Sequence, residues 1–317
     1  MILSIILLIV GFVILIKGAD VFVDGASSVA KNFHLSKMLI GLTIVAFGTS
    51  APEFAVSIQS LIGGNGDIVL GNVIGSNILN ILLILGVSSV IHNLTVKNNT
   101  VKKELPITLL ITTLLIVLMS DSLFDRSISN SFTRGDGFVL LLFFTVFIYY
   151  LISMMRNKVD EDDEEKAKYS MGKSIIYTII GIACIVLGSN FVVEHASNIA
   201  SYLGVSERLI SLTIVALGTS LPELVTSIMA TKKGEYDIAI GNVVGSNIFN
   251  IGMVLGLPIA LFGGISKISF SYIDLCALFL SAFLLFIFSY NDRKITKKEG
   301  IVMLVLFTIY YSYVIFI

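Results

Sequence analysis

Charged residues, cysteines and histidines are all scarce in this sequence. Of its 317 residues only 14% are charged and 56% are hydrophobic, and the mean hydropathy is +0.94, which excludes an ordinary soluble domain. The two cysteines, Cys184 and Cys276, lie in separate apolar stretches and indicate neither a disulfide nor a metal site. No Ser/His pair, GxGD aspartate or HExxH motif lies within an apolar stretch, so we expect no intramembrane hydrolase and no enzyme.

Long apolar runs, by contrast, are abundant. They reach about 20 residues, the length that crosses a hydrocarbon core of roughly 30 Å. The runs are continuously apolar, whereas the strands of a membrane barrel alternate apolar and polar residues. The sequence therefore predicts an all-α polytopic membrane protein with ten transmembrane helices, near residues 2–23, 36–62, 69–93, 105–121, 136–155, 173–195, 206–232, 239–263, 271–290 and 299–317.

The chain also contains an internal repeat. Residues 41–86 return as residues 211–256 with a constant offset of 170 and no gap, and 26 of the 46 positions are identical. We expect a first five-helix repeat at 1–155, an acidic linker at 156–172 and a second five-helix repeat at 173–317. Because five is odd, the second repeat enters the membrane from the opposite side, which predicts two inverted repeats related by a pseudo-twofold axis.

The basic residues give the predicted orientation. With the N-terminus outside, sixteen Lys and Arg residues fall in inside loops and four in outside loops, while Lys17 falls at the end of the first span. This bias fits the positive-inside rule. We expect a multi-pass plasma-membrane protein with both termini outside and the linker in the cytoplasm. Carboxylates at 160–165 make a regulatory calcium loop conceivable, but the run lacks the glycine and spaced ligands of an EF-hand, which favours a solvated linker.

Two glutamates fall well inside the repeated segments. Glu53 and Glu223 occupy equivalent positions in GTSAPE and GTSLPE, and a carboxylate at mid-membrane costs roughly 2.5 to 3.5 kcal/mol. An ion pair could offset this cost, but no basic residue is expected in the membrane core of any span. The carboxylates therefore need protons or bound cations. Pro52 and Pro222 lack an N–H and should break each helix, which frees backbone oxygens beside the hydroxyls of the preceding Thr-Ser pair.

A second pair of motifs, GNVIGSNILN and GNVVGSNIFN, supplies amide and hydroxyl oxygens. Their polar residues have the spacing i, i+4, i+8, so each set lies along one helix face: Asn72, Ser76 and Asn80, and Asn242, Ser246 and Asn250. Hydrogen bonding between membrane helices is an alternative role for them. Because the predicted site contains only oxygen ligands, it favours hard cations such as Ca²⁺ and Na⁺ over Zn²⁺ or Cu⁺. Competition between cations for shared oxygens would permit antiport.

These motif pairs, in a ten-span inverted duplication, resemble the cation/calcium exchanger superfamily, and specifically its prokaryotic sodium/calcium exchanger branch. The resemblance implies a calcium site built from Glu53, Glu223 and the backbone oxygens of Thr49 and Thr219. It implies flanking sodium sites that share the glutamates and use Ala46, Ser50 and Ser76 on one side, and Ala216, Thr219, Ser220 and Ser246 on the other, with Ser220 and Ser50 reaching across. It also implies that the first and sixth spans slide across the others.

One departure from the family pattern concerns the driving ion. Relatives often have aspartate at the position of Asn250, and potassium-dependent members rely on an acidic residue there, whereas this chain has asparagine at both Asn80 and Asn250. We therefore expect Ca²⁺ export driven by Na⁺, with the bilayer and these two ions as partners and with no cofactor, nucleic acid or protein partner. A proton-driven calcium antiporter of the same fold is the alternative, and paired broken helices disfavour a passive channel.

Overall fold

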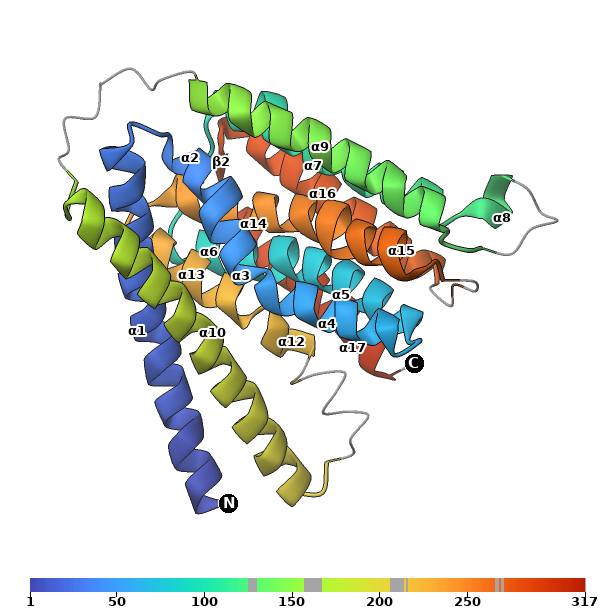
Figure 1. Ribbon diagram of the computed structural model, residues 1–317, viewed down its shortest axis with the longest axis horizontal. Helices are drawn as coiled ribbons and strands as arrows, with labels where there is room; N and C mark the ends of the chain where they lie inside the picture. Colours follow the sequence, from blue (N-terminus) through green and yellow to red (C-terminus); the bar gives the residue numbers. More distant parts are fainter. Residues whose placement is uncertain are drawn as a thin grey trace.

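The computed structural model describes residues 1–124, 130–156, 167–205, 214, 216–265, 268 and 271–316, which are almost entirely helical (Figure 1). Seven helices in the described part are long and apolar enough to cross a membrane, and a bent pair, Lys37–Thr49 with Ala51–Ile62, brings the number to as many as eight. Large apolar side chains such as Leu142 and Phe316 face outward, 68% and 85% exposed. The chain is a multi-pass helical membrane protein.

The first half contains a long helix, a broken span and several shorter helices. Its elements, in chain order, are α1 (Ile2–Asn32), α2 (Lys37–Ile40), the π-helical η1 (Gly41–Val45), α3 (Ala46–Thr49), α4 (Ala51–Ile62), α5 (Gly66–Leu79), the π-helical η2 (Asn80–Leu85), α6 (Gly86–Ile91), β1 (Leu94–Thr95), the π-helical η3 (Thr100–Glu104), α7 (Leu105–Leu118), α8 (Asp121–Phe124) and α9 (Arg134–Arg156).

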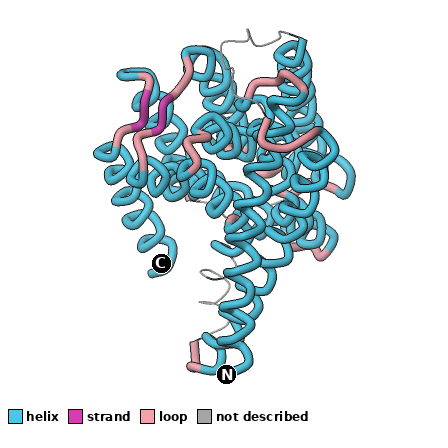
Figure 2. The backbone as a smooth tube through the Cα atoms, turned by 90° about the vertical axis from the view of Figure 1, so that its left-hand side faces the viewer, coloured by secondary structure: helices cyan, strands magenta, loops and turns pink. Residues whose placement is uncertain are grey.

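The second half follows a similar order. Its described elements are α10 (Met171–Tyr202), α12 (Ala216–Thr219), α13 (Leu221–Lys232), α14 (Tyr236–Phe249), the π-helical η5 (Asn250–Leu255), α15 (Gly256–Phe262), α16 (Tyr272–Asp292), β2 (Lys294–Ile295) and α17 (Lys297–Phe316). Strands β1 and β2 pair antiparallel and join the two halves at one end of the molecule (Figure 2). The acidic run at 160–165 and the start of the seventh predicted span lie outside the described residues.

The expected spans coincide with helices wherever the structure describes them, but two helices are longer than expected. Helix α1 continues to Asn32 and α10 to Tyr202, because their second halves carry small residues that pack closely and not only the large apolar residues of a membrane span. Lys17, which was expected at the end of the first span, consequently lies in the middle of α1 with an exposed side chain. His195 of α10 is buried, with only 8% of its surface exposed.

Helices α1 and α10 form an antiparallel pair that lies along one side of the remaining helices (Figure 1). The two backbones approach closely at glycines that recur every seven residues, including Gly18 and Gly25 on α1 and Gly181 and Gly188 on α10. A Cβ at Gly181 would lie 2.6 Å from the Cα of Phe22. Only glycine permits this distance, and close approach of small residues is a typical way for membrane helices to associate.

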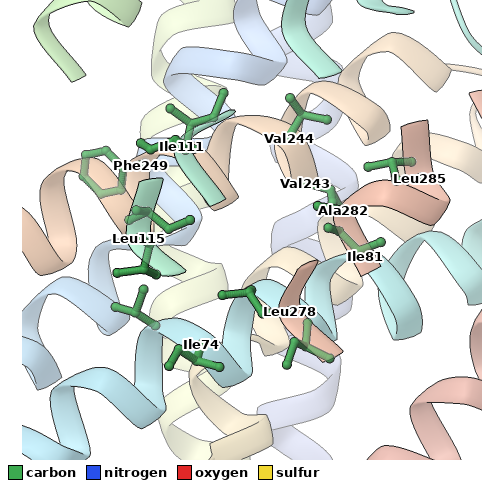
Figure 3. Packing of buried hydrophobic residues seen from close by; sticks show 14 of the residues in the cluster. Ile74, Ile81, Ile111, Leu115, Val243, Val244, Phe249, Leu278, Ala282 and Leu285 are labelled. Carbon is green, nitrogen blue, oxygen red and sulfur yellow. The ribbon is translucent and has the colours of Figure 1, made fainter. Parts of the chain in front are cut away.

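The core lies between α5 and α14, the two most buried of the long helices. Val243 and Val244 of α14 belong to one apolar cluster with Ile74 of α5 and with side chains of α7 and α16, such as Leu115 and Leu278 (Figure 3). Helix α14 also crosses η1 closely, since a Cβ at Gly241 would lie 3.0 Å from the Cα of Gly41. This crossing positions the polar face of α14 against the broken span of the other half.

The two sequence copies adopt the same local structure. The first broken span changes direction at Ser50 (φ −83°, ψ 8°), where its two parts meet at 46°, and Ser220 has nearly the same conformation (φ −90°, ψ 6°). The π-helical turns η2 and η5 begin at Asn80 and Asn250, which are also equivalent. Wide turns of this kind often occur at functional sites.

Candidate cation site

The two glutamates lie where the broken spans resume. Pro52 and Pro222 occupy the first turn of α4 and α13, where the missing N–H costs no helical hydrogen bond. Glu53 and Glu223 follow in the same first turns, and both side chains are fully buried, with no exposed surface. The N-terminus of a helix carries partial positive charge, so each break places a carboxylate where the backbone favours a negative charge.

Each carboxylate accepts a hydrogen bond from a serine of the other repeat. Ser50 donates to Oε1 of Glu223 at 2.8 Å, and Ser220 donates to Oε1 of Glu53 at 3.2 Å. The two serines are the residues at which the spans break, so the breaks face each other across the boundary between the halves. The structure therefore brings the two glutamates of the predicted calcium site together with Ser50 and Ser220 of the predicted flanking sodium sites.

Two asparagines form hydrogen bonds with the helices that carry the two glutamates. Asn72 donates to the backbone oxygen of Glu53 at 3.0 Å and lies 3.1 Å from Oγ of Ser57. Asn242 makes the same pair of contacts with Glu223 at 3.3 Å and with Ser227 at 2.9 Å. These side chains therefore contact the backbone of each glutamate, and not its carboxylate.

Thr49 and Ala46 of the first broken span contact residues of α14. Oγ1 of Thr49 lies 3.0 Å from Oδ1 of Asn242 and 3.1 Å from the carbonyl of Val45. Ser246 donates to the carbonyl of Ala46 at 3.5 Å. Thr219 and Ala216 lie in the equivalent helix α12, and Thr219 also borders a cavity described below.

The remaining asparagines form a network between the halves. Asn250 donates to Oγ of Ser76 at 3.1 Å, whereas Asn80 donates to Oδ1 of Asn247 at 3.0 Å. Asn247 in turn donates to the carbonyl of Asn77 at 3.2 Å. The equivalent residues Asn80 and Asn250 thus donate to different partners, and of the two only Asn250 donates to a residue of the predicted sodium sites, Ser76.

Several buried oxygens at the site have no hydrogen-bond partner among the described residues. They are Oε2 of Glu53, Oε2 of Glu223, Oδ1 of Asn80 and Oδ1 of Asn250. Within the same part of the chain, neither glutamate forms an ion pair with a basic side chain, although five such pairs occur elsewhere. A buried polar atom without a partner is costly, and a buried carboxylate more so. The set of oxygens fits a hard cation, which these atoms can coordinate directly.

A cavity of about 540 Å³ reaches the site from one face of the molecule. Its walls come from α4, α10 and α12, and its lining includes Pro52 and Thr219 next to the two breaks. Ser189 of α10 also lines it and donates to the carbonyl of Gly218 at 2.9 Å. The sequence predicted that Pro222 frees this carbonyl; the structure shows that it accepts a hydrogen bond from a serine hydroxyl.

Sequence reasoning missed three features of the polar interior. Ser57 and Ser227 follow the glutamates by four residues and share the 170-residue offset, which is the signal that could have identified them. Glu104 is fully buried and accepts a hydrogen bond from Tyr150. Asp274, which lies 170 residues after Glu104, accepts one from Tyr310 at 3.0 Å, so an acidic residue bonded by a tyrosine occurs in both halves.

The fold and the candidate site describe a multi-pass membrane protein with a buried cluster of carboxylate, hydroxyl and amide groups. The chain matches the sodium/calcium exchanger protein family over residues 3–153 and 173–316, and it belongs to that family, whose members are transporters and not enzymes. It is 37% identical to CaxA of Alkalimonas amylolytica over 327 residues, covering 100% of this chain and 99% of that protein.

Two further relatives place the chain among prokaryotic exchangers. The sodium/calcium exchanger MaX1 of Methanosarcina acetivorans is 32% identical over 334 residues, with 95% of each chain covered. A structure of the sodium-calcium exchanger NCX_Mj superposes with a TM-score of 0.85 at 32% identity and covers 98% of both chains.

Proposed function

We propose that the protein is a secondary antiporter that moves Ca²⁺ across the membrane in exchange for Na⁺. The observation that carries this proposal is the pair of fully buried glutamates, each with one oxygen bound by a serine of the other repeat and one oxygen without a partner among the described residues. Two carboxylates can neutralise one Ca²⁺ or more than one Na⁺. MaX1 and NCX_Mj, which are similar to this chain, are named as sodium/calcium exchangers.

The calcium ligands would be Glu53, Glu223 and the backbone oxygens of Thr49 and Thr219. Calcium takes six to eight oxygens and tolerates irregular geometry, which suits carboxylates and carbonyls from two helix breaks. Asn80 and Asn250 carry orphaned amide oxygens that complete the polar environment. The site holds only two acidic residues because position 250 is asparagine, so we propose that potassium is not co-transported.

The sodium sites would flank the calcium site and share its glutamates. On one side Ala46, Ser50 and Ser76 supply oxygens, with Ser220 contacting Glu53 from the other repeat. On the other side Ala216, Thr219, Ser220 and Ser246 do so, with Ser50 contacting Glu223. Because both kinds of ion need the same carboxylate oxygens, they bind in alternation, and this competition couples the flow of one ion to that of the other.

We further propose that ten transmembrane helices form two inverted five-helix repeats, 1–155 and 173–317, joined by a cytoplasmic linker at 156–172. The equivalent breaks at Ser50 and Ser220, and the equivalent π-helical turns, support the repeat. Both termini would face outside the plasma membrane. The cavity that reaches Pro52 and Thr219 from one face supports alternating access, because it leads to the two breaks from that face.

A proton-driven calcium antiporter is the second candidate. It is favoured by the lack of a basic partner for either glutamate in the described part of the chain, since protons can neutralise carboxylates when no metal is bound. In this mode Glu53 and Glu223 would carry protons in one direction and Ca²⁺ in the other.

Calcium uptake into everted membrane vesicles separates the two candidates. We expect an outward-directed Na⁺ gradient, with the internal and external pH equal, to drive uptake of radioactive calcium. A pH gradient of the same energy, without Na⁺, should drive little uptake. Uptake driven by the pH gradient and not by the Na⁺ gradient would support the proton-driven mechanism instead. Uptake of calcium with neither gradient would contradict antiport. Potassium in place of sodium serves as the matched cation control.

A further inference from the structure

Three pairs of positions related by the 170-residue offset carry different residues in the two repeats. Asp20 and Asp24 lie on α1 and Lys233 follows α13; at an offset of 170 residues their counterparts are Asn190, Glu194 and Gly63. The first set therefore contains a lysine beside two aspartates, whereas the second set contains no cation. We call the surface around the first set the lysine face and the surface around the second set the cavity face.

On the lysine face, ion pairs connect α1 to the turn after α13. Nζ of Lys233 lies 2.8 Å from Oδ1 of Asp20 and 2.6 Å from Oδ1 of Asp24, and it also donates to the backbone oxygen of Asp20. The side chains of Lys233 and Asp24 are only 21% and 17% exposed, so solvent screens this pair less than a surface pair. Lys168 pairs with the second oxygen of Asp24.

A second set of polar contacts on the lysine face involves Glu235. Ser27 of α1 donates to Oε1 of Glu235 at 2.7 Å, and Lys37 lies 2.9 Å from Oε2 of that glutamate. Beneath these polar links, Ala26 and Ala30 pack in one apolar cluster with side chains of α13 and α14, such as Ala230 and Ile238. The lysine face of the site is therefore closed by both charge and packing.

The cavity face is hollow at the equivalent place. Glu194 is exposed and, together with Asn190, lines the 540 Å³ cavity between α4 and α10. No lysine or arginine of the described chain lines this cavity. The cavity extends to Pro52 and Thr219, so the site is reached from the face that lacks the ion pairs.

We propose that Lys233 is a gate residue, which holds α1 against the turn after α13 and so keeps the site closed on the lysine face. This proposal rests on the alternating access of the proposed function. Opening the lysine face separates Lys233 from both aspartates, whereas closing the cavity face brings Gly63 toward Glu194 without forming an ion pair. The state that is open on the cavity face is consequently the more populated one, and its ions bind with higher apparent affinity from that face.

Thiol accessibility at one pair of equivalent positions tests the gate. Val56 lines the cavity, whereas its counterpart Thr226 is fully buried. In a background with Cys184 and Cys276 replaced by alanine, V56C should react quickly with N-ethylmaleimide and T226C slowly. Lys233→Gln should slow the first and accelerate the second, each by roughly three- to ten-fold, as expected for the loss of partly buried ion pairs. The reagent is uncharged, so the lost charge does not alter its approach.

Two further variants make the test specific. Lys97 pairs with Asp237 at 2.7 Å on another part of the structure and does not contact α1 in that pair, so Lys97→Gln should leave both rates unchanged. Gly63→Lys supplies the missing cation opposite Glu194, and it should shift the rates in the same direction as Lys233→Gln. Adding Glu194→Gln should abolish that shift.

The outcomes separate the gate from the proposed function. Equal rates in Lys233→Gln and Lys97→Gln, in a protein whose wild-type form exchanges Na⁺ for Ca²⁺, would overturn the gate and leave the exchange mechanism intact. A shift in Gly63→Lys that persists without Glu194 would also overturn it, because the ion pair would not be the cause. Failure of the wild type to exchange these ions would instead overturn the proposed function.

Discussion

Oγ of Ser50 lies 2.8 Å from Oε1 of Glu223, although the two residues are 173 positions apart in the chain. Ser220 makes the mirror contact with Glu53 at 3.2 Å. Each glutamate therefore accepts a hydrogen bond from a serine of the other repeat, and the candidate site forms only when the two halves pack together. This reciprocity explains why a duplicated sequence builds one central site and not two separate ones.

Removing one charge from the centre should abolish exchange. Glu53→Gln and Glu223→Gln keep the shape of each side chain but leave one carboxylate for a divalent ion. We expect calcium uptake driven by Na⁺ to fall by roughly thirty-fold or more, because truncating one partner of a buried charge pair costs about 2–5 kcal/mol. Glu104→Gln is the matched control, since Glu104 is equally buried and bonds Tyr150 instead. Uptake near wild type in either site variant would show that the carboxylate is not a ligand.

Loss of a crossing hydroxyl should weaken sodium binding more than calcium binding. Ser50→Ala and Ser220→Ala each remove a hydrogen bond to a carboxylate, and such bonds contribute about 1.5–3 kcal/mol. We expect the Na⁺ concentration for half-maximal exchange to rise about ten-fold in each variant, measured as calcium uptake at increasing internal Na⁺. Ser→Thr at the same positions retains the hydroxyl and should restore most of the affinity. A similar loss in the threonine variants would point to packing instead.

A third carboxylate at the centre should make exchange depend on pH. Asn250 donates to Ser76 at 3.1 Å, and Asn250→Asp replaces its amide by a group that is ionised only above its own pKa. The variant should resemble the wild type at low pH, where the new aspartate is protonated. As the pH rises the added charge should strengthen binding of Ca²⁺, so the difference grows. The measurement is the calcium concentration that gives half-maximal uptake, determined for the variant and the wild type across a pH series. A difference between the two proteins that stays constant at every pH would contradict the prediction.

Adding one methyl group between α1 and α10 should disturb the pair. A Cβ at Gly181 would lie 2.6 Å from the Cα of Phe22, so Gly181→Ala forces the backbones apart. Overpacking of this kind costs about 1–3 kcal/mol, and we expect a lower melting temperature in detergent together with slower exchange. Gly172→Ala on the same helix is the control, because no described atom beyond the neighbouring residues and backbone of its own helix lies within 4 Å of its Cβ position. Equal stability of the two variants would contradict the close approach.

The sequence alone determined the class of the protein and most of the candidate site. Apolar length predicted the membrane helices, because hydrocarbon thickness fixes how many residues a span needs. The 170-residue offset matched Glu53 with Glu223 and Pro52 with Pro222. A helix break and a carboxylate within an apolar segment each depend on a few consecutive residues, so the sequence alone could predict both. The breaks at Ser50 and Ser220 lie where the prolines predicted them.

Only the tertiary structure decided which groups meet. It showed that Asn72 and Asn242 donate hydrogen bonds to the backbone oxygens of the two glutamates, and that Ser189 donates one to the carbonyl of Gly218. It also showed that the buried Glu104 accepts a hydrogen bond from Tyr150. Each contact joins segments that are not neighbours in the sequence, so neither spacing nor composition specifies it.

The tertiary structure also decided the difference between the two faces. Asp24 and Glu194 are equivalent in the repeat, yet Asp24 lies in an ion pair with Lys233 and Glu194 lines a cavity. In the proposed alternating-access mechanism, α1 and α10 pack against the other helices in two nearly equivalent ways. We expect their relative free energies to depend on contacts such as the pair between Asp24 and Lys233, which forms only in the folded chain and has no counterpart in the other repeat.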